Sequence, residues 1–406
     1  MSLVQSRPDS WDDPAEGLFR RVQEKVAELE PELVQIRRDI HAHPEVARKE
    51  VRTTRVIEAR LRQAGLAPRM LDGTGLMCDV GPDVPGQGRV ALRADIDALP
   101  VQDLSRHPWR SLVPGVAHAC GHDVHAVVVL GAGLALAALA ADGLLHHGVR
   151  LVFQPAEETM PGGALDVVAQ GVLDGVDRIA AVHCEPKLEV GRVGTRIGPI
   201  TSASDAVSVT VTSAGGHTSR PHLTGDVVYA LGQVITQVPA VLGRRLDPRS
   251  GVNLTWGAVH AGKAHNAIPS TGTVTGTLRC LDVRAWERAG QVLHDAVEQV
   301  VAPYDVDVTV RHARGVPPVD NDAAVNGALE AAAAAVLGPD GVVLTEQSLG
   351  GEDFAWYLTK VPGAMVRLGT ATPGSPRYDL HQGDLDVDER AIVIGARLLA
   401  RFALGR

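Results

Sequence analysis

Five short segments of the chain concentrate side chains that can bind a metal ion or carry a proton. The densest spans residues 118–125 (HACGHDVH) and directly precedes a strongly apolar stretch. A cysteine and a histidine on either side of one glycine can both face the same metal ion from a loop. Ordinary turns rarely hold so many ligands, so this segment predicts a metal site even when it is taken alone.

Each of the other four segments also has an ordinary structural explanation. Two carboxylates after an apolar strand can belong to a turn, and adjacent acidic residues can be a solvated surface pair. A histidine at a strand end can be a satisfied core residue. The candidate side chains in these segments are Asp95 and Asp97, Glu157 and Glu158, His183, and His381.

Taken together, the segments favour a metal site over these separate explanations. Adjacent Glu157 and Glu158 point to different sides, so one can bind a metal ion while the other stays free to carry a proton. Thiolate and imidazole ligands favour zinc over magnesium or calcium. The ligands suffice for two divalent ions a few ångströms apart, the arrangement of aminopeptidase-type enzymes.

The order of the helices and strands that must position these segments predicts two domains. The length of 406 residues also favours two domains over one. Residues 16–65 have helical periodicity, and strands then alternate with helices up to residue 183, which is typical of an α/β domain. Residues 205–310 instead follow the order β-α-β-β-α-β of a ferredoxin-like unit. The predicted elements include helices 124–141, 283–301 and 352–358 and strands 149–154 and 271–280.

We therefore predict an α/β protein with an inserted α+β domain. The catalytic metal-binding domain is discontinuous, with residues 1–199 and 315–406, and the ferredoxin-like lid covers residues 200–314. Insertion of one domain into a surface loop of another leaves a cleft between the two.

Composition limits the partners of the protein. The net charge of −9 argues against nucleic-acid binding, which needs a basic face. The four cysteines are far apart, so we expect reduced thiols in a cytoplasmic protein. Residues 1–16 lack the apolar stretch of a signal peptide. The longest apolar stretch, residues 126–141, is short for a membrane span and suits a buried helix.

Several motifs resemble one known family. They are the segments 38–45 (RDIHAHPE), 95–100 (DIDALP), 118–125 (HACGHDVH), 154–158 (QPAEE) and 215–217 (GGH). In this order they resemble the amidohydrolase branch of the zinc-dependent aminoacylase/carboxypeptidase family. That branch includes hippurate hydrolases, N-acyl-amino-acid amidohydrolases and indole-acetyl-amino-acid hydrolases. The similarity runs from about residue 30 to 400 without large gaps.

The resemblance implies a role for each candidate residue. Glu157 would be the general base, and His217 of the lid would steady the developing oxyanion, in its own subunit or in its partner's. Asn266 and Arg279 match positions that hold the substrate's carboxylate, and Asp95 and Asp97 would support the ligands from behind. The implied metal ligands are Cys120, His122, Glu158, His183 and His381.

The sequence departs from the family pattern in three places. Arg220 follows the histidine motif of the lid and adds a positive charge near the expected substrate, so we count it among the candidate substrate-binding residues. Gly351 stands where serine is common, and Leu385 stands where phenylalanine is expected. The last two changes look tolerable.

The predicted function is hydrolysis of the amide bond of N-acyl amino acids, in a hippurate hydrolase- or aminoacylase-like reaction, by metal-activated water. Two divalent ions are expected per chain, zinc first, with manganese, cobalt or nickel as alternatives. Family members form homodimers through the lid, with a tetramer as the alternative. Two alternatives remain: a dipeptidase or carboxypeptidase with the same chemistry, and a non-catalytic binding protein in which Glu157 has no catalytic role. No Gly-x-Ser-x-Gly elbow is present, which disfavours a nucleophilic hydrolase.

Overall fold

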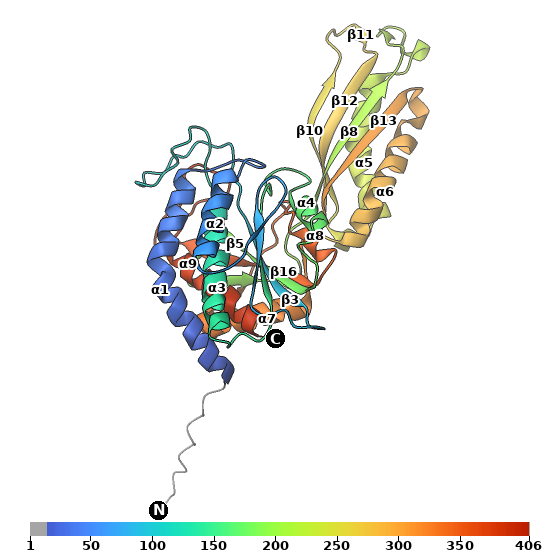
Figure 1. The fold of residues 1–406 in the computed structure, drawn as a ribbon. Helices are drawn as coiled ribbons and strands as arrows, with labels where there is room; N and C mark the ends of the chain where they lie inside the picture. Colours follow the sequence, from blue (N-terminus) through green and yellow to red (C-terminus); the bar gives the residue numbers. More distant parts are fainter. Residues whose placement is uncertain (1–13, 406) are drawn as a thin grey trace, which may run out of the picture.

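The computed structural model describes residues 14–405 and shows a large body and a smaller one that projects from it (Figure 1). Most of the segment in which we expect no signal peptide therefore lies outside the described residues. The large body is built on an eight-stranded sheet of order β1-β2-β4-β3-β5-β16-β6-β15. Its strands are β1 (Arg69–Met70), β2 (Leu76–Val80), β3 (Arg89–Asp95), β4 (Val149–Gln154), β5 (Val176–Glu189), β6 (Val193–Thr195), β15 (Val342–Leu344) and β16 (Gly363–Ala371).

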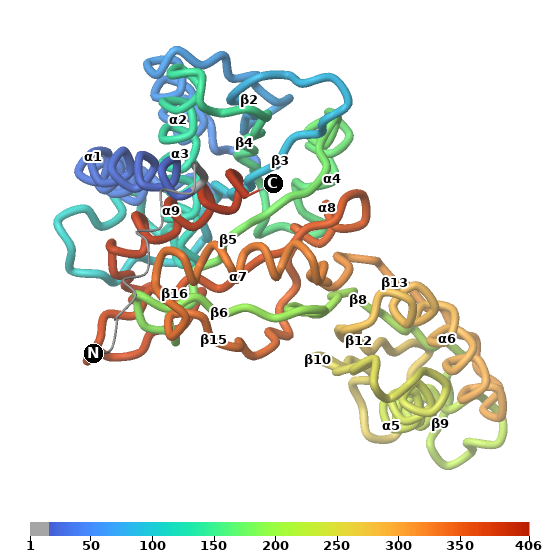
Figure 2. The backbone as a smooth tube through the Cα atoms, turned by 90° about the horizontal axis from the view of Figure 1, so that it is seen from below, coloured from blue at the N-terminus to red at the C-terminus, as the bar shows by residue number. Residues whose placement is uncertain are grey.

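Helices cover both faces of this sheet, so its central strands are buried on both sides. On β3, alternate residues Val90 and Leu92 belong to one buried cluster, whereas Ala91 belongs to the cluster on the opposite face. Figure 2 shows α1, α3 and α9 on one side of the sheet and α4 and α8 on the other. The helices are α1 (Pro14–Ala42), α2 (Val51–Gln63), α3 (His122–Ala141), α4 (Ala164–Ala169), α7 (Ala323–Leu337), α8 (Ala355–Leu358) and α9 (Arg390–Leu404).

The central strands β3, β4, β5 and β16 run parallel to their neighbours in this group, whereas β2, which lies next to the edge strand β1, is antiparallel to β4. Parallel strands end at the same edge of a sheet, and ligands bind beyond that edge in open α/β sheets. The candidate residues that follow these strands are therefore brought to one place.

The smaller body, which we call the lid, has a four-stranded antiparallel sheet of order β10-β12-β8-β13. Helices α5 and α6 pack on one face of it around their own buried cluster. This is the ferredoxin-like arrangement that the sequence predicts. Its elements are β8 (Ala203–Thr212), α5 (Val227–Arg245), β10 (Asn253–Ala261), β12 (Thr271–Cys280), α6 (Val283–Val301) and β13 (Asp307–Val316).

Two short strand pairs mark the two ends of the lid. Strand β7 (Gly198–Pro199) pairs with β14 (Asp320–Asn321), so the chain enters and leaves the lid side by side. Strand β9 (Gly216–His217) pairs with β11 (Ala267–Ile268) at the end farthest from the large sheet (Figure 1). The bounds that we predict for the two domains stay a prediction.

Three predicted elements differ from the structure. Helix α3 begins at His122 rather than at residue 124. Gly121, with φ 84°, makes the turn that leads directly into this helix. The predicted helix 352–358 shrinks to Ala355–Leu358, since the residues in front of it turn toward the buried strands. The helical region 16–65 is interrupted between α1 and α2. Helix α3 is apolar and long enough to span a membrane, but it is a buried core helix, as expected.

Candidate metal centre and active site

The implied metal ligands meet beyond the ends of the parallel strands. Their nitrogen, sulfur and oxygen atoms form two overlapping groups, each with its atoms within 4.8 Å of one another. Cys120 belongs to both: it joins His122 and His183 in one group, and Glu158 and His381 in the other. A shared cysteine between two such groups suits two ions held close together.

The geometry leaves a free ligand atom on each histidine of the first group. Nδ1 of His122 lies 3.2 Å from Oδ1 of Asp97, and Nδ1 of His183 lies 2.8 Å from the carbonyl oxygen of Cys184. Both hydrogen bonds favour the tautomer in which Nε2 carries no proton. Nε2 of His183 then lies 3.6 Å from Sγ of Cys120.

The fit to a metal ion is supported by a buried atom without a partner. Nε2 of His122 is enclosed and makes no hydrogen bond, although Oε1 of Glu158 lies 3.8 Å away. A buried polar atom without a partner is costly, unless a ligand completes it. The mixed set of sulfur, nitrogen and oxygen donors around it therefore fits divalent ions such as zinc.

His381 reaches the second group through a strained loop. Its backbone has φ 62°, a region that non-glycine residues rarely adopt, and its N–H donates to the carbonyl oxygen of Ala119 at 2.7 Å. This bond ties the loop before α9 to the segment that carries Cys120. Nε2 of His381 then lies 3.4 Å from Oε1 of Glu158. Strain of this kind concentrates at functional sites.

Asp97 supports two ligands at once. Its Oδ1 accepts from Nδ1 of His122, and its Oδ2 accepts from the backbone N–H of Glu158 at 2.9 Å. Both carboxylate oxygens are thus engaged behind the ligands. The supporting role that the sequence analysis expects for Asp97 stays a prediction.

Asp95 accepts from Nη1 of Arg93 at 2.7 Å and from Nδ1 of His125 at 2.6 Å, and its Oδ2 lies 3.8 Å from Nε2 of His122. The other ring nitrogen of His125 accepts from the backbone N–H of Cys184 at 2.8 Å. Since both nitrogens of His125 are occupied, it is a structural residue, although the sequence places it beside the ligands.

Glu157 lies beside the ligands in the cavity, and its carboxylate can group with His122 and Glu158 or with Glu352 and Asp353. Its Oε2 lies 3.9 Å from Nε2 of His122, and the residue is buried. Burial, and then the nearby carboxylates of Glu352 and Glu158, raise the pKa of Glu157 well above its usual range. Bound dications would lower this pKa again. The side chain is therefore placed to exchange a proton.

Burial also sets the protonation of two of the ligands, His183 and Cys120. It lowers the pKa of His183 well below its usual range, with the cationic Arg367 adding to the effect, so this imidazole is neutral as a ligand must be. Burial raises the pKa of the Cys120 thiol to about 12 in the absence of ions. Metal binding to this thiol would release a proton.

The loop that carries both glutamates is held by residues to which the sequence analysis gave no role. The backbone N–H of Ala156, whose φ is 59°, donates to Oε1 of Glu50 at 2.9 Å. Behind the loop, the fully buried Arg93 donates to Asp353 at 2.7 Å and to Gln154 at 2.9 Å. The signal for Arg93 was its position inside an apolar strand, because a buried guanidinium needs carboxylate partners.

A cavity of about 580 Å³ opens over the ligands and is lined by Cys120, Glu157, Glu158, His183 and His381. Of the lid residues expected to bind substrate, Arg279 lines it and donates to the carbonyl oxygen of Leu349.

The other three lid candidates lie at the far end of the lid. His217 is in β9, Arg220 follows it, and Asn266 directly precedes β11 (Figures 1 and 2). Among the described residues, none of these three lines the cavity of its own chain. The ring of His217 instead accepts a hydrogen bond from Ser219.

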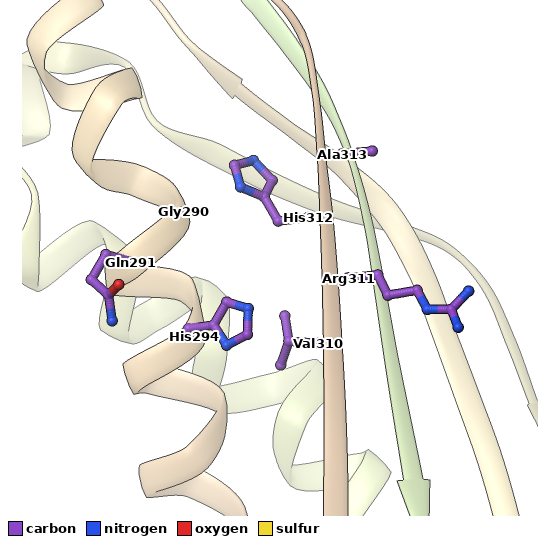
Figure 3. Close-up of a pocket in the computed structure, with 7 residues that line it drawn as sticks. All are labelled: Gly290, Gln291, His294, Val310, Arg311, His312 and Ala313. Atoms are coloured by element: carbon purple, nitrogen blue, oxygen red, sulfur yellow. The ribbon is translucent and has the colours of Figure 1, made fainter.

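A second hollow lies in the lid between α6 and β13, and it contains none of the predicted site residues (Figure 3). Its His312 lies 2.6 Å from Oδ2 of the buried Asp205, which also accepts from the indole N–H of Trp286. These contacts hold the base of the lid together, so we assign this histidine a structural role.

Residues 91–405 match the family model of peptidase family M20/M25/M40. The chain belongs to this family. A Rhodococcus jostii protein that carries the name of a glutamate–cysteine ligase is 49% identical over 371 residues, which are 91% of this chain and 46% of that protein. The chain thus spans less than half the length of this relative.

Two further relatives match over most of their length. N-acetyl-L-cysteine deacetylase of Bacillus subtilis is 35% identical, over 92% of this chain and 88% of that protein. The crystal structure of a dinuclear metal-binding M20 peptidase of Bacillus subtilis is 32% identical, with a TM-score of 0.80 over 93% of this chain and 98% of that one. The predicted family, fold class and enzyme class are therefore confirmed: the protein is a metallo-amidohydrolase or peptidase.

Proposed function

We propose that this M20 protein hydrolyses the amide bond of N-acyl amino acids and releases the free amino acid. The observation that carries the proposal is Glu157, a buried carboxylate that faces the same cavity as the five assigned ligands and is not itself one of them. A non-catalytic metal site has no use for such a group. The relative named as an N-acetyl-L-cysteine deacetylase supports a small N-acyl amino acid as substrate.

Cys120, His122, Glu158, His183 and His381 would hold two divalent ions. The donor set favours zinc, and manganese, cobalt or nickel are alternatives. Bound ions supply Lewis acidity, which lowers the pKa of a water molecule and polarises a carbonyl group.

The residues of the chain then perform the proton transfers. Glu157 accepts the proton of the attacking water and passes it to the nitrogen of the leaving amine as the amide bond breaks. Glu157 is buried, which limits the contact of its carboxylate with bulk water. Asp97 would hold the ligand His122 in orientation, and Asp95 fixes the neighbouring His125, so the ligand groups are formed before substrate arrives.

The lid supplies the remaining contacts. Arg279, together with Asn266, would bind the α-carboxylate of the substrate, and His217 would donate a hydrogen bond to the carbonyl oxygen. Because the β9–β11 tip lies far from its own cavity, we propose that the partner subunit's His217 acts there, in a homodimer formed through residues 200–314. A tetramer built from such dimers, and a cytoplasmic location, stay predictions.

The second candidate is a dipeptidase or carboxypeptidase, which the peptidase of similar structure supports. A panel of N-acetyl and N-benzoyl amino acids and of dipeptides decides between the two, tested with zinc-, manganese- and cobalt-loaded enzyme. We expect faster hydrolysis of the N-acyl amino acids. Faster hydrolysis of dipeptides would establish the alternative, and no hydrolysis with any metal would exclude both.

A further inference from the structure

Arg367 is a buried cation that lines the cavity over the metal ligands. It lies in the middle of β16 and is only 5% exposed. In the parallel sheet its partner on β5 is His183, and both residues line the same cavity. The sequence analysis assigned Arg367 no role.

The other buried arginines of the described residues show what such a side chain normally requires. Arg37 lies 2.7 Å from Asp123, Arg93 lies 2.7 Å from Asp95, and Arg150 lies 2.7 Å from Asp79. Each guanidinium therefore has a carboxylate partner, as buried charges generally do.

Arg367 differs from these three arginines. Within residues 14–405 it makes no ion pair or side-chain hydrogen bond. Of the carboxylates that line the cavity, Glu157 is the proposed base and Glu352 faces Arg93 at 3.3 Å. Glu158 faces His381, and Asp379 pairs with Lys187 at 3.3 Å. An unpaired guanidinium beside ligands of divalent cations is unfavourable in the free enzyme. An anionic group that enters the cavity would relieve this cost.

We propose that Arg367 binds a second carboxylate of the substrate, in addition to the α-carboxylate assigned to Arg279. The substrate class is then N-acyl amino acids that carry an additional acidic group. This inference rests on the proposed amidohydrolase function. The second carboxylate can belong to the amino-acid side chain, as in N-acetylglutamate, or to the acyl group, as in N-succinylalanine. Arginine binds either one through its planar fork of donors.

The test compares substrates that differ in charge but hardly in shape. N-acetylglutamate is paired with N-acetylglutamine, and N-succinylalanine with its succinamoyl analogue. For each pair, the ratio of kcat/KM for the acid to that for the amide is measured. We expect at least about a tenfold preference for the acid in one pair, which also identifies the side of the substrate that Arg367 binds.

Variants assign the preference to its residue. Arg367→Met keeps much of the side-chain length and should lower the acid-to-amide ratio at least about tenfold, whereas Arg367→Lys should restore part of it. Arg279→Met should slow both members of a pair. Arg220→Ala tests whether the exposed lid arginine causes the acid preference instead. The proposal would be overturned if the acid-to-amide ratio of kcat/KM fell in this variant but stayed unchanged in Arg367→Met. So would a wild-type enzyme without any acid preference.

A binding measurement separates failure of this inference from failure of the proposed function. Calorimetry of the zinc-loaded protein with glutarate and with butyrate needs no turnover. Tighter binding of glutarate that is lost in Arg367→Met supports the inference even if no amide is hydrolysed. Equal binding of the two acids, in an enzyme that does hydrolyse N-acyl amino acids, refutes it. The circular dichroism spectrum and Tm of Arg367→Met confirm that the variant is folded.

Discussion

Asp97→Asn should weaken metal binding without removing a single metal ligand. In the wild type the two oxygens of Asp97 accept from two donors, Nδ1–H of His122 and the backbone N–H of Glu158. Asparagine has nearly the same shape but only one acceptor oxygen. If that oxygen faces Glu158, the amide N–H₂ faces His122 and donates to Nδ1. The ring proton must then move to Nε2, the nitrogen that faces the ligand group.

The size of the effect follows from this conflict. Loss of a supporting partner of a metal-binding histidine costs about 10- to 100-fold in metal affinity. That range corresponds to about 1.4–2.7 kcal/mol. We expect the upper part of the range for Asp97→Asn, because the ring proton of His122 moves onto the nitrogen that faces the ligand group. The zinc affinity of wild type and variant is measured by competition with a chelator of known affinity.

Asp205→Asn is the matched control. Asp205 is equally buried and also accepts from a histidine, His312 at 2.6 Å, and from a backbone N–H, that of Gly315 at 3.0 Å. It lies at the base of the lid and away from the ligands, so its variant should lose stability but keep its zinc affinity. An Asp97→Asn affinity within about twofold of wild type, or an equal loss in both variants, would refute the reasoning.

Four further predictions concern Glu157, Cys120 and His217. Glu157→Gln should retain its metal but lose about 10²–10⁴-fold in kcat, and half the wild-type rate would show that another residue is the base. In the presence of chelator, the free energy of unfolding of the wild type should fall more steeply above about pH 4.5 than that of Glu157→Gln. The reason is that Glu157 keeps a proton in the folded protein that it releases in the unfolded chain. Superimposable profiles of unfolding free energy against pH for the two proteins would contradict this. Cys120→Ser should lower the Tm of the zinc-loaded protein more than the Tm in chelator, since a serine hydroxyl is a poor zinc ligand, and equal losses in both conditions would argue against Cys120 as a ligand. Mixing inactive His217→Ala and Glu157→Gln chains should restore partial activity if the lid tip acts in the partner's site, whereas no recovery after confirmed subunit exchange means that it does not.

The sequence by itself determined the chemistry and the order of the elements. The Cys120-Gly-His122 spacing and the adjacent Glu157 and Glu158 are local patterns, so they can be interpreted without knowing the fold. Periodicity likewise predicted β4, β12 and α6 with the bounds that the structure has. It also predicted the β-α-β-β-α-β order of the lid. Each of these features depends on residues close together in the chain.

Only the tertiary structure decided which residues far apart in the chain come together and which role each can have. His125 looked like a further ligand until the backbone N–H of Cys184 proved to occupy its second nitrogen. Arg367 gained a possible role only because the pairing of β16 with β5 sets it beside His183 over the cavity. The same holds for the lid, whose tip carries His217 away from the cavity of its own chain. These relations depend on strand pairing and on the path of the lid, which no local pattern of residues encodes, because each joins segments separated by tens to hundreds of residues in the chain.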